Sequence, residues 1–438
     1  MFKTLKNAWR VPELKKKLLF TLLIVVLYRL GANIPVPYVN SALLSEADLF
    51  NAGILSFLST LSGGALAQAT LLALGVSPYI TASIVIQLLT IAIPALERWS
   101  KDGENGRKKI TALTRIITIA LALVTAIGYT IYLNSSGMLV EKLVGFTGFF
   151  RGMIMVLCYC AGAALVMWMA EKINESGIGN GISMILFANI VAGTYTALTV
   201  LWNQAFGTGF NWVGLVCSIV CVLVFTAMIV LIVWMSDAER RIPIQYAKRV
   251  VGRKMYGGQN SHLPLKVNMA GVMPIIFANS IVAILPTIAS FMPNTGFANF
   301  VNKWLGPNTW IYFGVFLVLL VAFAFFYVMI SFNPVEVANN IKNNGGAIPG
   351  IRSGRPTIEF VKKVLNRVTL VGALLVAIIA CFPMLISNVT NYFNPVAGMF
   401  AVLSFGGSSL MIVVGVALET VRDLEAQMSL RNYKGFLD

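Results

Sequence analysis

The residues best suited to chemistry in this sequence are five cysteines and one histidine, and their spacing favours neither a catalytic nor a metal site. The cysteines lie within apolar runs, none forms a CxxC pair, and the histidine lies in a different segment. Metal sites and disulfides both need such groups to converge. We therefore predict buried, apolar cysteines with no metal or cofactor. These residues are Cys158, Cys160, Cys217, Cys221, Cys381 and His262.

Ionisable groups are missing from the apolar runs, which bears on two further classes of protein. An intramembrane enzyme needs a nucleophile with a partner, but Ser83 and Ser183 have no His, Asp or Lys nearby in sequence. An ion-coupled transporter normally buries charges near the bilayer midplane, whereas all 17 acidic residues lie in loops, tails or at the edges of apolar runs. Arg29 is the deepest charge, and its position near the outer half of the first span permits its side chain to reach the membrane surface. Without a GxxxxGK[ST] motif, energy must come from another protein.

Composition and hydropathy indicate the elements that hold these residues. The 438 residues are 58% hydrophobic and 11% charged, and runs of about 20 apolar residues predict a polytopic membrane protein. No cleavable signal peptide is visible at the start of the chain. We predict ten spans, at approximately 18–36, 76–93, 110–133, 149–170, 182–201, 213–235, 270–291, 310–332, 364–387 and 397–418.

The distribution of Lys and Arg orients these spans. With ten spans, 27 of the 33 basic residues fall on the side that also holds both termini, and only Lys142 and Lys303 lie in the opposite loops. Cytoplasmic loops carry the excess of Lys and Arg, so both termini are predicted to be cytoplasmic. Two long basic connections lie on that side. Residues 240–268 alternate apolar and polar residues around Gly252, which predicts a β-hairpin, and residues 332–363 are rich in Gly, Asn and Pro. They could simply orient the protein, but their length favours docking of an acidic or phosphate-rich partner.

Two short stretches of the sequence match each other. Residues 75–82 read GVSPYITA and residues 271–278 read GVMPIIFA, with five of eight positions identical. Such matches can arise by chance. With five spans in each half, however, the two copies would run in opposite directions, as in an inverted repeat. We expect Pro78 and Pro274 to remove helical donors inside spans, so that both segments face protein or a cavity.

Several ordered motifs closely resemble the SecY family, the central subunits of bacterial Sec protein-conducting channels. They are SGGALAQATLLALGVSPYITASIVIQLL, DGENGRKK, ESGIGNGISMILFANIVAG, SHLPLKVNMAGVMPIIFANS, FNPVEVANNIKNNGGAIPGIRSG and FGGSSLMIVV. The resemblance implies an all-α clamshell of two inverted five-helix halves in the plasma membrane. The implied halves are residues 1–205 and 206–420, with cytoplasmic loops 236–269 and 333–363 and a cytoplasmic tail at 421–438.

The resemblance also implies roles for particular residues. The segment 54–68, which is too short and glycine-broken to cross a bilayer, corresponds to a re-entrant plug helix and includes Ile54, Phe57, Leu58, Leu61, Ser62, Gly63 and Gly64. The implied pore ring is Val76, Ile80, Ile182, Leu186, Ile276 and Ile412, where valine and leucine stand at two positions at which family members often have isoleucine. A lateral gate between the second and seventh spans, beside the third and eighth, would carry Thr81, Gln87, Asn279 and Ser280. Without the resemblance, ordinary core packing is the better explanation for any one of the ring residues.

The resemblance further implies partners and no enzymatic activity. The implied partners are SecE, SecG, the motor ATPase SecA, the ribosome, polypeptides with signal sequences and membrane lipids. SecA and the ribosome would dock on Arg240, Arg241, Lys248, Arg249, Arg253, Lys254, Arg352 and Arg355. A secondary transporter with inverted repeats and an intramembrane enzyme are the alternative classes. The missing midplane charges weaken the first, and the unpartnered serines weaken the second.

Overall fold

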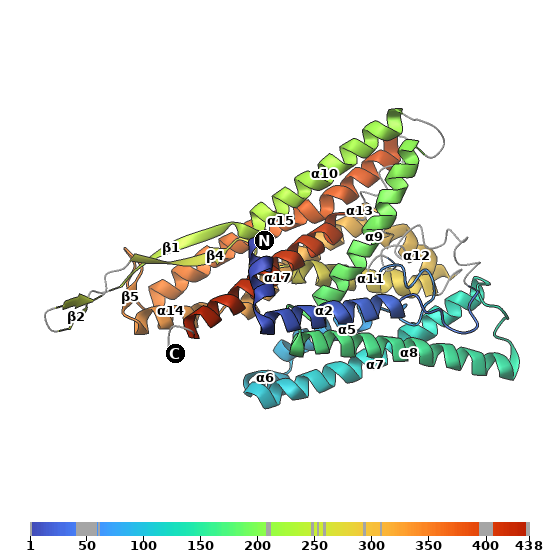
Figure 1. The fold of residues 1–438 in the computed structure, drawn as a ribbon, viewed down its shortest axis with the longest axis horizontal. Helices are drawn as coiled ribbons and strands as arrows, with labels where there is room; N and C mark the ends of the chain where they lie inside the picture. Colours follow the sequence, from blue (N-terminus) through green and yellow to red (C-terminus); the bar gives the residue numbers. More distant parts are fainter. Residues whose placement is uncertain are drawn as a thin grey trace.

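The structure is a computed structural model dominated by long helices. It describes residues 2–40, 59, 62–206, 212–246, 249–251, 254–256, 260–291, 295–306, 309–393 and 406–434. Figure 1 shows α2, α7 and α8 lying side by side, α10 and α15 slanting away from them, and a β-hairpin projecting from one end. The helices are α1 (Phe2–Arg10), α2 (Pro12–Gly31), α5 (Ser77–Ala92), α6 (Pro94–Lys101), α7 (Gly103–Ser135), α8 (Gly145–Ser176), α9 (Gly181–Phe206), α10 (Trp212–Asp237), α11 (Met273–Phe291), α12 (Gly296–Leu305), α13 (Trp310–Ser331), α14 (Pro334–Asn343), α15 (Arg355–Phe393) and α17 (Gly406–Lys434).

Within the described residues, five helices are long and apolar enough to cross a membrane, namely α7, α8, α10, α13 and α15, and α5 with α6 makes a sixth if the bent pair counts as one span. The apolar parts of α9 and α11 are shorter. Each of the ten predicted ranges overlaps a helix, although the last does so only from Gly406 onward. The polytopic helical class is therefore confirmed, and the number ten stays a prediction.

Prolines set the beginnings of several helices. Pro12, Pro94 and Pro334 stand in the first turns of α2, α6 and α14, where a backbone N–H would have no acceptor within the helix. Ile93 is extended between α5 and α6, and the two helices meet at 102°. The predicted span 76–93 thus ends where this bend begins.

The matched stretches have the same backbone design, but one expectation about them was wrong. Gly75 and Gly271 both have positive φ, at 55° and 63°, and α5 and α11 begin two residues after them. Pro78 and Pro274 are consequently the second residues of these helices. A proline in the first turn removes no intrahelical hydrogen bond, so neither residue demands the compensation that we expected inside a span. Both segments nevertheless face protein as expected, because Pro78 and Pro274 are buried.

The predicted hairpin is confirmed, and it extends into a sheet that joins both long connections. Strands β1 (Glu239–Tyr246) and β4 (Asn260–Lys266) pair antiparallel, and β2 (Arg249–Val251) pairs with β3 (Lys254–Tyr256) near the tip. Strand β5 (Gly346–Ala347) of the second connection pairs with the end of β1, which gives the order β4-β1-β5. The two basic connections therefore form one unit.

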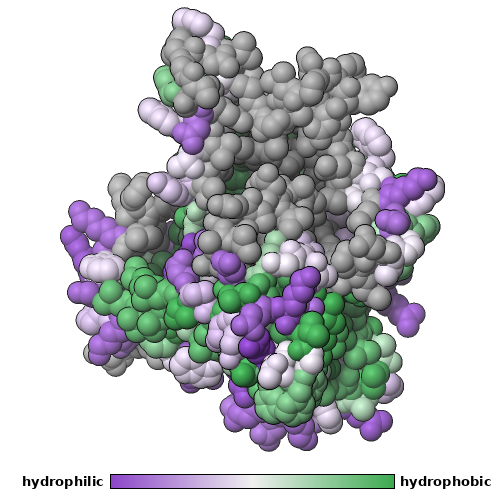
Figure 2. Space-filling view, turned by 90° about the vertical axis from the view of Figure 1, so that its right-hand side faces the viewer, coloured by the Kyte–Doolittle hydropathy of each residue, from purple (hydrophilic) through white to green (hydrophobic). Residues whose placement is uncertain are grey.

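The main core lies between helices from both halves of the sequence. It gathers buried side chains of α2, α5, α8, α9, α10, α11, α13, α15 and α17 into one cluster. A second cluster joins α7 and α8 to residues 66–74. Outside these cores, large apolar side chains on α2, α7, α8, α10 and α13 are exposed, as expected for helices that face lipid. Figure 2 shows broad apolar patches beside hydrophilic residues on the face that it presents.

Candidate functional site

The six residues expected to form an apolar ring converge in the main core. They come from the start of α5, from α9, from α11 and from α17, and they belong to or pack against one cluster. Val76, Ile80, Leu186, Ile276 and Ile412 are buried, whereas Ile182 is half-buried. Because these helices are far apart in sequence, only the tertiary fold brings the side chains together.

Residues 62–66 form a tight turn that leads toward this cluster. Gly63 and Gly64 both have positive φ, which glycine adopts without steric cost. The Ser62 hydroxyl donates to the Ser59 carbonyl oxygen (3.0 Å) and accepts from the Leu66 amide (3.1 Å). The turn is thus fixed by its own side chain. The expected plug residues Ile54, Phe57, Leu58 and Leu61 lie outside the described residues.

Three other elements hold this turn in place. Tyr129 of α7 donates its buried hydroxyl to the Leu66 carbonyl oxygen at 2.6 Å. Arg29 of α2 donates to the Gly63 carbonyl oxygen at 3.2 Å, and its Nη1 lies 3.5 Å from Oδ1 of Asn189 on α9. The sequence permitted snorkelling for Arg29, and the structure adds that its half-buried guanidinium finds acceptors within the protein.

The helices of the expected lateral gate are in contact. Helix α5 packs against α7 and α11, and α11 packs against α13. Phe277 of α11 stacks edge-to-face on Phe323 of α13, with ring centroids 5.8 Å apart. This aromatic pair joins α11 to α13, the helix next to the seam between α5 and α11.

The four polar residues of the expected gate do not bond one another across this seam in the described structure. Thr81 and Ser280 donate to carbonyl oxygens of their own helices, at Ser77 and Ile276. Gln87 is exposed. Asn279 is only 3% exposed, and neither atom of its amide has a hydrogen-bond partner. The polar closure that we expected is therefore absent among these four residues, and one of them, Asn279 of α11, has a buried amide without a hydrogen-bond partner.

The basic residues expected to dock partners gather at the hairpin end. Arg240, Arg352 and Arg355 are exposed, and Arg241 forms an ion pair with Glu239 at 2.6 Å. The backbone before α15 is fixed because Thr357 donates its hydroxyl to the Arg352 carbonyl oxygen at 2.9 Å. Arg249 and Lys254 lie on β2 and β3, and Lys248 and Arg253 fall outside the described residues.

The base of the hairpin is tied to the last helix. Arg422 of α17 donates to Asp237 Oδ1 at 2.7 Å and to the Ser236 carbonyl oxygen at 2.8 Å. The pKa of Lys266 at the end of β4 is lowered mainly by partial burial and, to a smaller extent, by the nearby positive charge of Arg422. The hairpin is therefore anchored to the helical body.

The cysteines behave as apolar side chains. Cys221 and Cys381 are buried, Cys158 and Cys160 are half-buried, and none of these four forms a disulfide, whereas the Cys217 side chain lies outside the described part of the chain. Within the described residues, no group of three or more His, Cys, Asp or Glu side chains could hold a metal ion.

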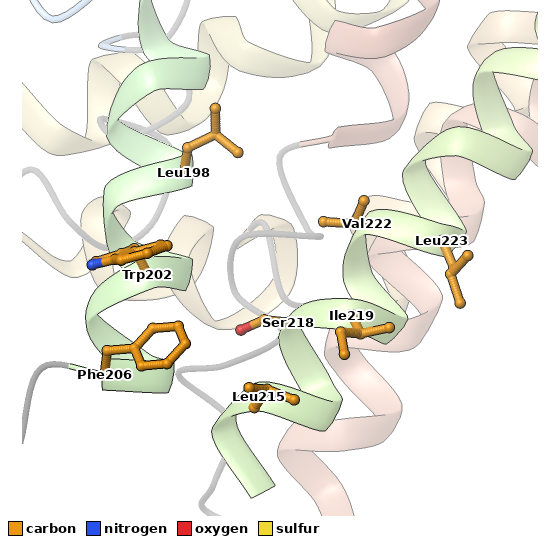
Figure 3. A pocket seen from close by; sticks show the side chains of 8 residues that line it. All are labelled: Leu198, Trp202, Phe206, Leu215, Ser218, Ile219, Val222 and Leu223. Atoms are coloured by element: carbon orange, nitrogen blue, oxygen red, sulfur yellow. The ribbon is translucent and has the colours of Figure 1, made fainter. Parts of the chain in front are cut away.

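An apolar pocket of about 420 Å³ lies away from these features, between α9 and α10. Figure 3 shows Leu198, Trp202 and Phe206 of α9 on one side of it and α10 residues on the other. Its lining contains no residue of the ring, the turn or the seam.

Sequence reasoning missed the contacts of Arg29 and Asn189. Arg29 was noticed only as the deepest charge, and Asn189 looked like one polar residue in an apolar run. A buried Arg in one span and an Asn in another are a recognisable signal, because such groups need partners in a membrane.

Comparisons with known proteins agree with this architecture. The family model described as SecY matches residues 70–421. The chain is 43% identical to the protein translocase subunit SecY of Streptomyces coelicolor and 40% identical to that of Bacillus subtilis, with 100% of each chain covered. Among solved structures it is similar in fold to one described as a protein conducting channel (TM-score 0.67, 18% identity, 96% of both chains). It is likewise similar to Sec61 in a canine ribosome-channel complex (TM-score 0.62, 16% identity, 96% of both chains).

Proposed function

The chain belongs to the SecY family, and from this premise we propose that it forms the passage through which a translocase moves unfolded secretory polypeptides across the plasma membrane. The observation that carries the proposal is the convergence of six apolar side chains from α5, α9, α11 and α17. These helices come from both halves of the sequence, so separating the halves would open a passage between them.

An apolar ring suits this task for physical reasons. A hydrophobic constriction opposes water and ions by dewetting. Val, Ile and Leu side chains also offer a passing polypeptide no hydrogen bonds, so no sequence would be retained by specific binding. We assign the constriction to Val76, Ile80, Ile182, Leu186, Ile276 and Ile412.

We assign the lateral exit for transmembrane segments to the seam between α5 and α11. Helices α5 and α11 pack against each other, and Asn279 of α11 has a buried amide without a hydrogen-bond partner. An apolar signal sequence can compete with such a seam, since each fully buried Leu or Phe contributes roughly 1.5–3 kcal/mol. The buried amide would gain a partner once the seam opened to water or to a peptide backbone.

The segment that ends at the Ser62–Gly64 turn is the proposed plug. A short, glycine-broken apolar segment neither crosses a bilayer nor remains in water, so a protein-lined funnel suits it. The turn is held by side chains of α2, α7 and α9. One similar solved structure is described in terms of a plug domain that stabilises the closed state (TM-score 0.65, 17% identity).

The proposed topology has ten spans in two inverted halves, 1–205 and 206–420, with both termini cytoplasmic. The matching starts of α5 and α11 support the two-fold relation. The basic sheet at the hairpin end is then cytoplasmic and would receive the ribosome or SecA. SecE and SecG would complete the complex in the membrane.

Reconstitution tests this function directly. The chain is combined with SecE and SecG in liposomes, and SecA, ATP and a preprotein are added outside. We expect ATP-dependent accumulation of protease-protected preprotein. Uptake of a small solute driven by an ion gradient, without preprotein import, would overturn the proposal.

A charge reversal tests the docking role in the same system. Arg352→Glu places an acidic group at an exposed position on the docking face, so we expect SecA-driven import to fall by about tenfold or more with normal membrane insertion. Lys342→Glu is the matched control, because it makes the same charge change at an exposed position of the same connection. Equal loss in both variants would show that only net charge matters.

A further inference from the structure

We propose that Arg29 and Asn189 form a clasp that couples the apolar ring to the plug, so that the plug is released when α9 moves away from α2. The clasp is defined as Arg29, Asn189 and the Gly63 carbonyl oxygen that faces Arg29. The inference rests on the proposed function of residues 54–68 as a plug and adds what holds it closed.

The clasp is built from groups that need one another. Asn189 is fully buried, and its Nδ2 donates to the Tyr28 hydroxyl oxygen at 2.8 Å. This bond turns Oδ1 toward Arg29, whose Nη1 lies 3.5 Å away and also donates to Gly63 at 3.2 Å. A partly buried guanidinium requires acceptors. Within the described residues, the Gly63 carbonyl oxygen and Asn189 Oδ1 accept from the Arg29 side chain.

Gly63 fits the clasp so closely that a side chain would break it. A Cβ atom at this position would collide with Arg29 Nη1 and would lie 2.8 Å from Asn189 Oδ1. The residue also has a φ of 66°, which other residues adopt only with strain. Two independent restraints, the lack of room for a Cβ atom and the positive φ, therefore explain why glycine stands at this position.

The position of Asn189 links the clasp to the ring. It lies three residues after Leu186, which puts both side chains on the same face of α9. Leu186 belongs to the ring and Tyr28 to the same apolar cluster. When a polypeptide spreads the ring and shifts α9, Asn189 leaves Arg29, and the hold on Gly63 weakens.

The clasp is tested by resting ion permeability of reconstituted channels without SecA or preprotein. Asn189→Leu removes the acceptor, and we expect permeability to rise by about tenfold, because hydrogen bonds to charged groups are among the stronger ones. Asn189→Asp keeps the volume and strengthens the link to Arg29, so permeability should fall below that of the native chain. Asn189→Ser, which is too short to reach Arg29, replaces Asn189→Leu if that variant does not fold.

Asn33→Ala is the matched control. Its side chain bonds the Arg29 main-chain oxygen at 2.8 Å and is exposed, so its loss should leave permeability unchanged. Arg29→Met should raise permeability as Asn189→Leu does, and the double variant should be no leakier than either single variant. A spin-label distance from the 62–66 turn to α9 should lengthen in the leaky variants, a change that general destabilisation would not confine to this pair.

Import of preprotein by the same preparations separates the two hypotheses. Normal import with unchanged permeability and distance in all clasp variants would overturn the clasp and leave the proposed function standing. Failure of the native chain to import preprotein would instead overturn the proposed function. Additive effects of Arg29→Met and Asn189→Leu would also contradict the coupling.

Discussion

At the scale of single residues, Asn279 is the least expected feature of the interior. Its amide is buried without a hydrogen-bond partner on α11, one of the two helices to which we assign the lateral exit. An unpaired buried amide costs about 1–3 kcal/mol, far more than a hydroxyl that bonds its own helix. Asn279 therefore destabilises the closed seam, while Thr81 and Ser280 are close to neutral.

This difference gives a prediction for the gate. Asn279→Leu should stabilise the closed seam, so that only preproteins with more apolar signal sequences are exported efficiently. The measurement is the export yield of a preprotein series in which the signal sequence gains one Leu at a time.

Ser280→Ala is the control, because the lost hydroxyl bonds only the Ile276 carbonyl oxygen. We expect its export profile to match that of the native chain. An identical profile for Asn279→Leu would show that the buried amide has no part in gating.

At the scale of elements, the turn at residues 62–66 shows how a short segment can be both held and releasable. It is fixed by the hydrogen bonds from Tyr129 and Arg29, by those of Ser62, and by the burial of Leu66 in the second core cluster. Each net hydrogen bond contributes about 0.5–1.5 kcal/mol, and more where a charge is involved. Such a total is small enough for a passing polypeptide to overcome.

Deletion of residues 57–67 should leave a folded channel that conducts ions more readily at rest. The physical reason is that, without the plug, dewetting at the apolar ring would be the only remaining barrier to ions. Ion flux across reconstituted planar bilayers measures the effect. Tyr129→Phe is the control, because it removes only the hydrogen bond to the Leu66 carbonyl oxygen and leaves the segment in place. Equal conductance of the deletion variant and the native chain would count against a plug.

At the scale of the whole molecule, the two ends differ in chemistry. Figure 1 shows the hairpin, α14 and the end of α17 at one end and α12 at the other. The long basic connections meet in the β4-β1-β5 sheet at the first end. This asymmetry is the structural counterpart of the charge bias along the sequence.

The proposed orientation predicts the side from which each end can be labelled. A single cysteine at Lys303 should react with an impermeant maleimide added to intact cells, because α12 lies at the outer end. A cysteine at Lys342 should react only after the membrane is permeabilised; both positions are exposed. The five native cysteines are replaced first, and labelling of both positions from the same side would refute the ten-span topology.

Much of this architecture could be predicted from the sequence because it depends on local pattern. Apolar run length predicts which segments are membrane helices, and alternation around Gly252 predicted the hairpin. The match between 75–82 and 271–278 coincides with two helix starts of the same backbone design, and the inverted repeat that it suggested stays a prediction. The expectation that Pro78 and Pro274 remove helical donors inside spans was wrong. Hydropathy does not show where the first turn of a helix lies. In the structure, the helix starts are marked by the positive φ of the preceding glycines, Gly75 and Gly271.

The sequence by itself determined the class of protein, the placement of the apolar segments and the excess of positive charge on one side. Those properties follow from composition and from the energetic cost of exposing polar backbone to lipid. Only the tertiary structure decided which side chains meet. It brought Ile80, Ile276 and Ile412 into one core, left the Asn279 amide unpaired and turned Arg29 toward Gly63 and Asn189. Contacts between residues some 160 positions apart, such as Arg29 with Asn189, depend on how helices pack, and hydropathy along one chain carries no information about that packing.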